Sequence, residues 1–171
     1  MKYIFDTSSV IVLLEICQLK KQLRAFSVRH CIYIPDKVRQ EFLEGCKIER
    51  EAIDIFSIIP PNVDNELLRY FIKNASSGEF WAISYAKNEK DCICVIDEGF
   101  GRNLCDFFKI RHIGSIGIIN EMKIQGFLSE EDLTDIRARI INSKFYLSKR
   151  LLKKLDEICA FKNAFQQKKV P

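Results

Sequence analysis

The stretch CICVIDE at residues 92–98 decides the fold, because an unbroken apolar run of strand length ends there in two acids. Such a run is typical of a strand that is buried on both faces of a parallel sheet. The run KYIFD at residues 2–6 has the same form and ends in Asp6. Because ligand sites in open α/β sheets form beyond the carboxyl ends of the strands, both runs are predicted to deliver carboxylates to one functional edge.

Three further short apolar runs alternate with segments of helical length. We predict strands at residues 2–5, 31–35, 56–59, 92–97 and 111–114. Helices are predicted at residues 9–17, 19–28, 36–44, 48–53, 65–73, 78–88, 99–108, 115–125, 129–142 and 148–159. This alternation predicts an α/β protein, a three-layer α/β/α sandwich with a mostly parallel five-stranded sheet.

Length and composition favour one globular domain. The chain has 171 residues, of which 47% are hydrophobic and 29% are charged, and this balance excludes disordered and collagen-like classes. We predict a domain at residues 1–160 and a loose basic tail at residues 161–171. No apolar run approaches the ~20 residues that a membrane-spanning helix needs. We expect no membrane association, no export signal and a cytoplasmic location.

Seven cysteines are present, and none of them forms a CxxC pair. Most have apolar neighbours, so they are interpreted as free core residues in a reducing compartment. Cys92 and Cys94 are expected on the same side of one strand, because strand side chains alternate.

The net charge of +4 is unevenly distributed, since residues 137–171 hold ten Lys and Arg against two acids. Within this segment, Lys149, Arg150, Lys153 and Lys154 flank an apolar stripe and are expected to face solvent. Such a basic end is suited to a polyanion, although a solvated helix and tail is the preferred interpretation of this pattern taken alone.

Two acids on predicted helices join the strand-end acids as candidates. Glu41 lies at the border of the apolar face of its helix, and Glu79 heads a stripe of small apolar residues. Taken singly, these acids also fit caps, turns or first helical turns. A convergence of four or five carboxylates requires a cation among them, and hard oxygen donors suit Mg²⁺ or Mn²⁺. Such ions activate water for phosphodiester hydrolysis.

The chain resembles the PIN domain, a compact α/β nuclease module, and in particular its toxin-type branch. The resemblance is carried by an ordered set of motifs rather than by any single one, and it spans roughly residues 2–155. The motifs are DTSSVI (6–11), VRQEFLEG (38–45), GEFWAISYA (78–86), CVIDEGFGR (94–102), HIGSIGII (112–119) and KFYLSKRLLKKL (144–155).

The resemblance implies functional roles for residues in the first four of these motifs. It implies that Asp6, Glu41, Glu79 and one of Asp97 and Glu98 bind one or two Mg²⁺ or Mn²⁺ ions and are the catalytic residues. It further implies that Ser8 supports the site by a hydroxyl hydrogen bond. Arg102 either binds a substrate phosphate or pairs with the acids.

The implied function is a divalent-metal-dependent endoribonuclease that acts on single-stranded or structured RNA. It acts either as the toxin of a type II toxin–antitoxin pair, with an antitoxin protein as partner, or as an RNA-processing nuclease. A third hypothesis is a PIN-like RNA-binding module without turnover, because Glu79 and Glu98 stand where the family usually has Asp. The resemblance also suggests that the protein forms a homodimer. Residues 19–28 and the last helix are candidate surfaces for it.

Overall fold

The computed structural model describes residues 1–45, 50–60 and 77–160. The strands are β1 (Lys2–Phe5), β2 (Cys31–Pro35), β3 (Ser57–Ile59), β4 (Cys92–Val95) and β5 (His112–Ile113). The helices are α1 (Thr7–Ile11), the π-helix η1 (Val12–Ile16), α2 (Lys20–Arg29), α3 (Asp36–Gly45), the 3₁₀ helix η2 (Arg50–Ile55), α5 (Gly78–Asn88), α6 (Gly99–Phe107), α7 (Ser115–Ile124), α8 (Glu130–Ile141) and α9 (Lys149–Cys159).

All five strands are parallel, and their order in the sheet is β3-β2-β1-β4-β5. The chain builds outward from β1 to β3 and then returns to the other side of β1 with β4. In the centre, Ile4 is level with Cys94 and Phe5 with Val95. The neighbours β1 and β4 therefore form the topological switch point of the sheet, where α/β proteins bind their ligands.

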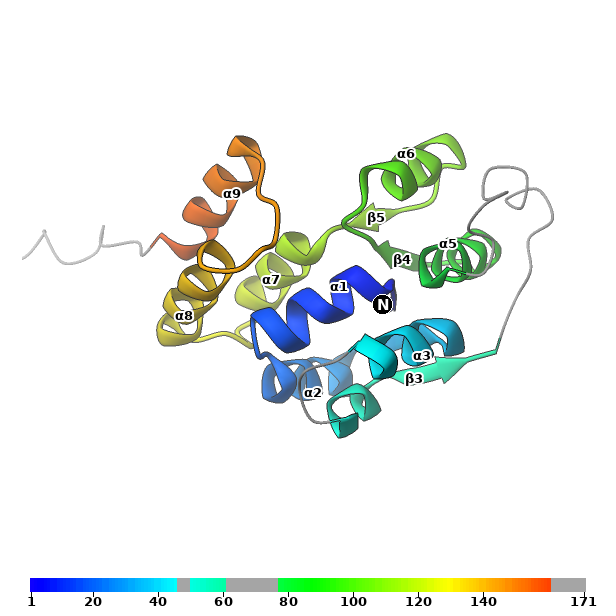
Figure 1. Ribbon diagram of the computed structural model, residues 1–171, viewed down its shortest axis with the longest axis horizontal. Coiled ribbons are helices and arrows are strands. Elements are labelled where there is room, and N and C mark those ends of the chain that lie inside the picture. Colours follow the sequence, from blue (N-terminus) through cyan, green and yellow to red (C-terminus); the bar gives the residue numbers. More distant parts are fainter. Residues whose placement is uncertain (46–49, 61–76, 161–171) are drawn as a thin grey trace, which may run out of the picture.

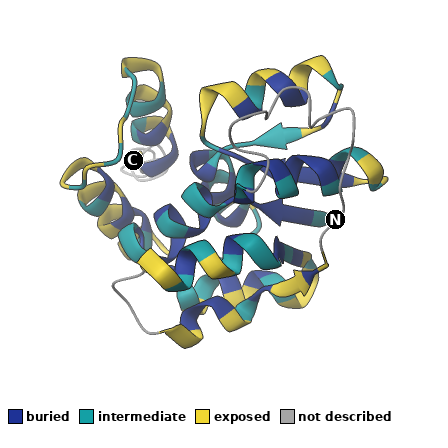
Figure 2. Cartoon of the chain, turned by 45° about the vertical axis from the view of Figure 1, so that its right-hand side comes forward, coloured by how far each residue is buried: buried dark blue, intermediate teal, exposed yellow. Residues whose placement is uncertain are grey.

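Helices cover both faces of this sheet, which confirms the predicted three-layer sandwich (Figure 1). Alternation along β1 sends Tyr3 and Phe5 to one core and Ile4 to the other. The larger core lies beneath α1, η1, α2, α3, α7, α8 and α9, whereas α5 and α6 enclose the smaller core. Figure 2 shows the buried sheet between helices whose outer faces are exposed.

The predicted helix at residues 9–17 differs most from the structure. It begins at Thr7, because the carboxylate of Asp6 accepts a hydrogen bond from the backbone N–H of Ser9 and caps the first turn. It then widens into η1, where the N–H of Cys17 bonds to the carbonyl of Val12, five residues back. Asp6 thus both follows a strand and starts a helix, so the cap that was one of its two predicted roles is present.

The other differences concern element ends. The predicted strand at residues 92–97 ends at Val95, and the strand at residues 111–114 is reduced to two residues. The segment at residues 48–53 forms a 3₁₀ helix that starts at Arg50. The predicted helix at residues 65–73 and the predicted tail at residues 161–171 lie outside the described residues.

The cysteines described by the structure are all free thiols, and Cys46 lies outside the described residues. Cys92 and Cys94 both belong to the smaller core, as their alternation predicts. Within the described part of the chain, no helix has the length and hydropathy to cross a bilayer.

The last helix, α9, is amphipathic, with an apolar face and a basic face as predicted. Leu155 and Ile158 of α9 are buried in the larger core, so its apolar stripe completes the fold. The basic side chains on its other face are exposed: Lys149, Arg150, Lys153 and Lys154.

Candidate active site

Asp6 lies directly beyond β1 and is a buried carboxylate with only 2% of its surface exposed. Its Oδ1 accepts a hydrogen bond from the N–H of Ser9 at 2.8 Å, and its Oδ2 accepts one from the hydroxyl of Ser8 at 2.7 Å. Burial raises the pKa of Asp6 to about 7, against the hydrogen bonds from Ser9 and Ser8 that lower it. The negative charge of Asp97 contributes to the rise.

Asp97 follows the neighbouring strand, β4, and is held by the start of α7. The N–H of Ser115 donates to Oδ1 of Asp97 at 2.9 Å, and the hydroxyl of Ser115 donates to Oδ2 at 2.5 Å. Burial raises the pKa of Asp97, while the hydrogen bonds from Ser115 and the charge of Arg102 lower it. The hydroxyl of Ser115 thus binds Asp97, and Gly114 occupies the cap position of α7.

Glu41, which is partly exposed, links three segments of the site edge from its position on α3. Its Oε1 accepts a hydrogen bond from the N–H of Gly78 at 3.0 Å, at the first residue of α5. Its Oε2 accepts a hydrogen bond from the hydroxyl of Thr7, at the first residue of α1. Glu41 thereby fixes the positions of two helix starts next to Asp6.

Glu79 lies in the first turn of α5 and faces α6. Its Oε1 is buried and has no hydrogen-bond partner among the described residues. Burial raises the pKa of Glu79, and the negative charge of Glu98 adds to the rise, whereas the backbone of Gly101 counteracts part of it. A buried carboxylate oxygen without a donor is costly, so this atom fits a cationic partner.

Arg102 stands one helical turn after Glu98, since its N–H bonds to the carbonyl of Glu98 at 3.1 Å. Its Nη1 is 3.5 Å from the point that a Cβ on Gly114 would occupy, and Oδ1 of Asp97 is 2.7 Å from the same point. The guanidinium is therefore close enough to Asp97 to lower its pKa.

A family model for the PIN domain matches residues 2–158. The chain belongs to the PIN-domain family. Searches of curated proteins and of solved structures gave no match. PIN domains are in general nucleases, so the edge of β1 and β4 in this PIN domain is the place to look for nuclease chemistry.

Four of the five predicted acids of this PIN domain form two interacting pairs. Asp6 interacts electrostatically with Asp97, and Glu79 with Glu98. Glu41 instead binds Thr7 and the backbone of α5. Within residues 1–45, 50–60 and 77–160, no group of three or more His, Cys, Asp or Glu side chains is gathered closely enough to hold a metal ion.

Three glycines of the PIN domain make room for these carboxylates, and sequence reasoning missed them. A Cβ on Gly78 would lie 2.8 Å from Oε2 of Glu41, and one on Gly101 would lie 2.2 Å from Oε1 of Glu79. On Gly114, a Cβ would lie 2.7 Å from Oδ1 of Asp97. Real Cβ contacts are longer than this, so a larger residue would have to displace its neighbours. These are Thr7, Val38 and Glu41 at Gly78, Ile96 and Glu79 at Gly101, and Asp97 at Gly114. Each glycine lies at a predicted helix start or within two residues of it, and that position was the available signal.

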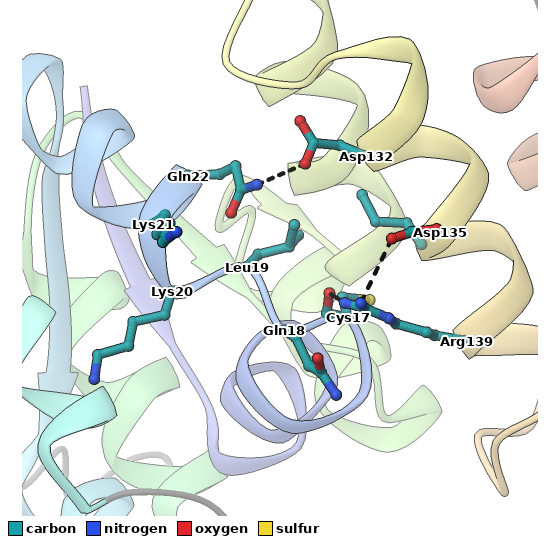
Figure 3. Close-up of a pocket in the computed structure, with 10 residues that line it drawn as sticks. Cys17, Gln18, Leu19, Lys20, Lys21, Gln22, Asp132, Asp135 and Arg139 are labelled. Carbon is teal, nitrogen blue, oxygen red and sulfur yellow. Dashed lines mark hydrogen bonds and ion pairs between the residues drawn. The ribbon is translucent and has the colours of Figure 1, made fainter.

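A cavity of about 320 Å³ lies away from the acids, where η1 and α2 meet α8 (Figure 3). Its polar groups bind one another: Nε2 of Gln22 donates to Asp132 at 2.7 Å, and Arg139 lies 3.5 Å from Asp135. Nη1 of Arg139 also donates to the carbonyl of Cys17 at 2.9 Å. The Arg139–Asp135 pair lies within α8, whereas the contacts of Gln22 and Cys17 fasten α8 to the first helices. We therefore interpret this cavity as part of the packing between them.

Proposed function

We propose that this PIN domain is a divalent-metal-dependent endoribonuclease. The observation that carries the proposal is the pair of buried aspartates, Asp6 and Asp97, at the ends of the two central parallel strands. Their closest donors are hydroxyl and backbone N–H groups, which orient the carboxylates without neutralising them. Buried charges of the same sign are retained where a cation joins them, and Mg²⁺ and Mn²⁺ prefer such oxygen donors.

The carboxylates of Asp6 and Asp97 are hard oxygen donors of the kind that a divalent ion prefers. Asp6 and Asp97 would be its first ligands. Glu79, whose Oε1 is buried and lacks a donor among the described residues, would have to approach them to complete a set of three acids. Glu41 and Glu98 are further candidate ligands, of which Glu98 acts on Glu79 through its charge. When bound, such an ion supplies an acidified water and stabilises the leaving oxygen of a phosphodiester.

The remaining polar groups have distinct tasks in this proposal. The hydroxyl of Ser8 and the N–H of Ser9 fix the rotation of the Asp6 carboxylate. Ser115 does the same for Asp97, so both acids are oriented before a substrate arrives. Arg102 presents a guanidinium next to Asp97 and binds a nonbridging oxygen of the substrate phosphate, where its charge offsets the charge that develops during attack.

The test is cleavage of total RNA by the purified protein, with Mn²⁺, with Mg²⁺ and with a chelator. We expect metal-dependent cleavage by the wild type and none in chelator. Asp6→Asn and Asp97→Asn should each reduce the rate by a factor on the order of 100 or more, because each removes a ligand charge while keeping the side-chain shape.

Asp54→Asn is the matched control, since Asp54 is an exposed aspartate in η2. This variant should cleave at the wild-type rate. Cleavage that continues in chelator, or that survives in both site variants, would refute the proposal. Binding of RNA and metal without any cleavage would instead favour a PIN-like binding module without turnover.

In the cell, we propose the role of the toxin in a type II toxin–antitoxin pair, with an RNA-processing nuclease as the second candidate. The toxin role is supported by the DTS motif at residues 6–8 and by the family membership. Induced expression should then arrest growth, Asp6→Asn should not, and co-expression of a short reading frame adjacent to the gene should restore growth. Growth at the normal rate with full ribonuclease activity would favour the processing role and would be compatible with a cytoplasmic enzyme.

A further inference from the structure

A basic groove lies between α6 and α9, next to the carboxylates of the candidate active site. It has a volume of about 660 Å³. Its lining residues are Arg102 from α6 and Ser148, Arg150, Leu151, Lys153, Lys154 and Glu157 from α9 and its cap. Figures 1 and 2 show α6 and α9 on opposite sides of this part of the molecule.

The charge of the groove is strongly positive, because four basic side chains face one acid. That acid, Glu157, lies 3.9 Å from Lys153 in an exposed pair, and such pairs are weak and screened by salt. The side chains of Lys153 and Glu157 are 81% and 65% exposed. The cations on α9 are thus available to a ligand, and the helix keeps its apolar stripe in the core.

The groove is continuous with the candidate active site through Arg102. This residue lines the groove, and its Nη1 also lies within 3.5 Å of the Gly114 position that Oδ1 of Asp97 approaches to 2.7 Å. One guanidinium therefore borders both spaces. A chain of phosphates that is bound along α9 would reach Asp97 beside this guanidinium.

We propose that this groove binds the phosphate backbone of single-stranded RNA and guides it from α9 to Asp97. The ligand class rests on the proposed ribonuclease function, and the groove itself rests on the geometry. A concave basic groove that tracks one backbone is the usual site for single strands. The described residues that line it include no aromatic side chain, so binding should depend on phosphates rather than on base stacking.

The experiment measures binding of a fluorescent oligouridylate of about ten nucleotides in chelator, where cleavage cannot interfere. Affinity is followed from about 50 to about 200 mM salt for the wild type and for the triple variant Arg150→Gln/Lys153→Gln/Lys154→Gln. Each lost phosphate contact removes about 0.7 from the slope of log affinity against log salt for a single strand, so the slope should decrease by about 2. The loss of affinity should therefore be about 20-fold larger at about 50 mM salt than at about 200 mM salt.

The control is Lys21→Gln/Arg24→Gln/Lys90→Gln, which removes the same charge from exposed positions on α2 and after α5. It should keep the wild-type slope. Equal losses in the two triple variants would refute the groove, because they would show attraction by net charge alone. If the groove triple variant fails to fold, Arg150→Gln alone should still lower the slope by about 0.7.

Two further arms separate this proposal from its alternatives. Wild-type protein that binds the oligouridylate with the expected slope, loses that slope in the groove variant and cleaves no RNA would leave the groove standing without the ribonuclease proposal. Conversely, wild-type cleavage together with an unchanged slope in the groove variant would refute the groove and leave the ribonuclease proposal standing. Higher affinity for duplex RNA than for the oligouridylate would refute a single-strand site and favour double-stranded RNA as the ligand. Higher affinity for a polyglutamate peptide would refute it in favour of an acidic protein.

Discussion

The substitution Asp6→Asn should have opposite effects on the stability of the metal-free protein and on its proposed activity. The substitution removes one buried negative charge and keeps the shape of the side chain. The carbonyl of Asn can still accept from the N–H of Ser9, and Ser8 can reverse its hydroxyl to accept from the new amide. We therefore expect the metal-free variant to be more stable than the wild type at neutral and higher pH.

The magnitude follows from the pKa of Asp6, which burial raises from 3.8 to about 7. Between these values the folded protein binds a proton that the unfolded chain has released, so wild-type stability decreases as the pH rises and levels off above about pH 7. One pKa unit corresponds to about 1.4 kcal/mol, which sets an upper bound of about 4 kcal/mol. Local relaxation reduces this figure, and we expect a gain of at least about 1 kcal/mol.

The assay is thermal unfolding in chelator across the pH range, for wild type, Asp6→Asn and the surface control Asp54→Asn. For a chain of this size, a gain of about 1 kcal/mol raises Tm by about 2–4 °C. The advantage of Asp6→Asn should be present at about pH 8 and should vanish below about pH 3, where the carboxyl group is protonated in both states. Millimolar Mn²⁺ should then stabilise the wild type and the control, and Asp6→Asn much less.

Two results would refute this reasoning. An Asp6→Asn variant with the full Mn²⁺-induced shift would remove Asp6 from the metal site. An advantage that is independent of pH would show that Asp6 is not an uncompensated buried charge, and that its role is limited to capping α1, where Asn substitutes well.

Gly101→Ala should lower stability by about 1–3 kcal/mol in denaturant titrations, because its Cβ would overlap Oε1 of Glu79, whereas Gly99→Ala, with open space around it, should not. Glu79→Gln should leave metal-free stability unchanged or higher and should reduce the Mn²⁺-induced rise in Tm; a full rise would exclude Glu79 as a ligand. Ser115→Ala removes the hydroxyl that lowers the pKa of Asp97, so the pH midpoint of Mn²⁺ binding should move upward, and an unmoved midpoint would contradict this role.

The fold was predictable because its signals are local. The apolar runs at residues 2–5 and 92–95 have strand length and end at acids, and α5 begins at Gly78 and ends at Asn88, as predicted. The start of α1 was not predictable in the same way. Whether Asp6 ends a strand or caps a helix depends on the rotation of its side chain, and both prove true at once.

The site was predictable only as far as strand ends determine it. The positions of Asp6 and Asp97 follow from the parallel sheet. The hydroxyl partner of Asp97 does not, because Ser115 is 18 residues away and reaches it only across the β4–β5 connection. The pairing of Glu41 with Thr7 depends likewise on the packing of α3 against α1, which periodicity does not encode.

The three glycines that adjoin the carboxylates have a consequence for comparing genomes. Each acid and its glycine form a matched pair in space, although Glu79 and Gly101 are far apart in the sequence. At Gly114 the acid is the one group that a Cβ would overlap, whereas Gly78 also adjoins Val38 and Gly101 also adjoins Ile96. A lineage that stops using Asp97 therefore no longer needs Gly114, and drift can then replace both. In an alignment of relatives, joint retention of Gly114 and Asp97 should mark members that still hold the site, and their joint loss should mark members that have kept only the fold.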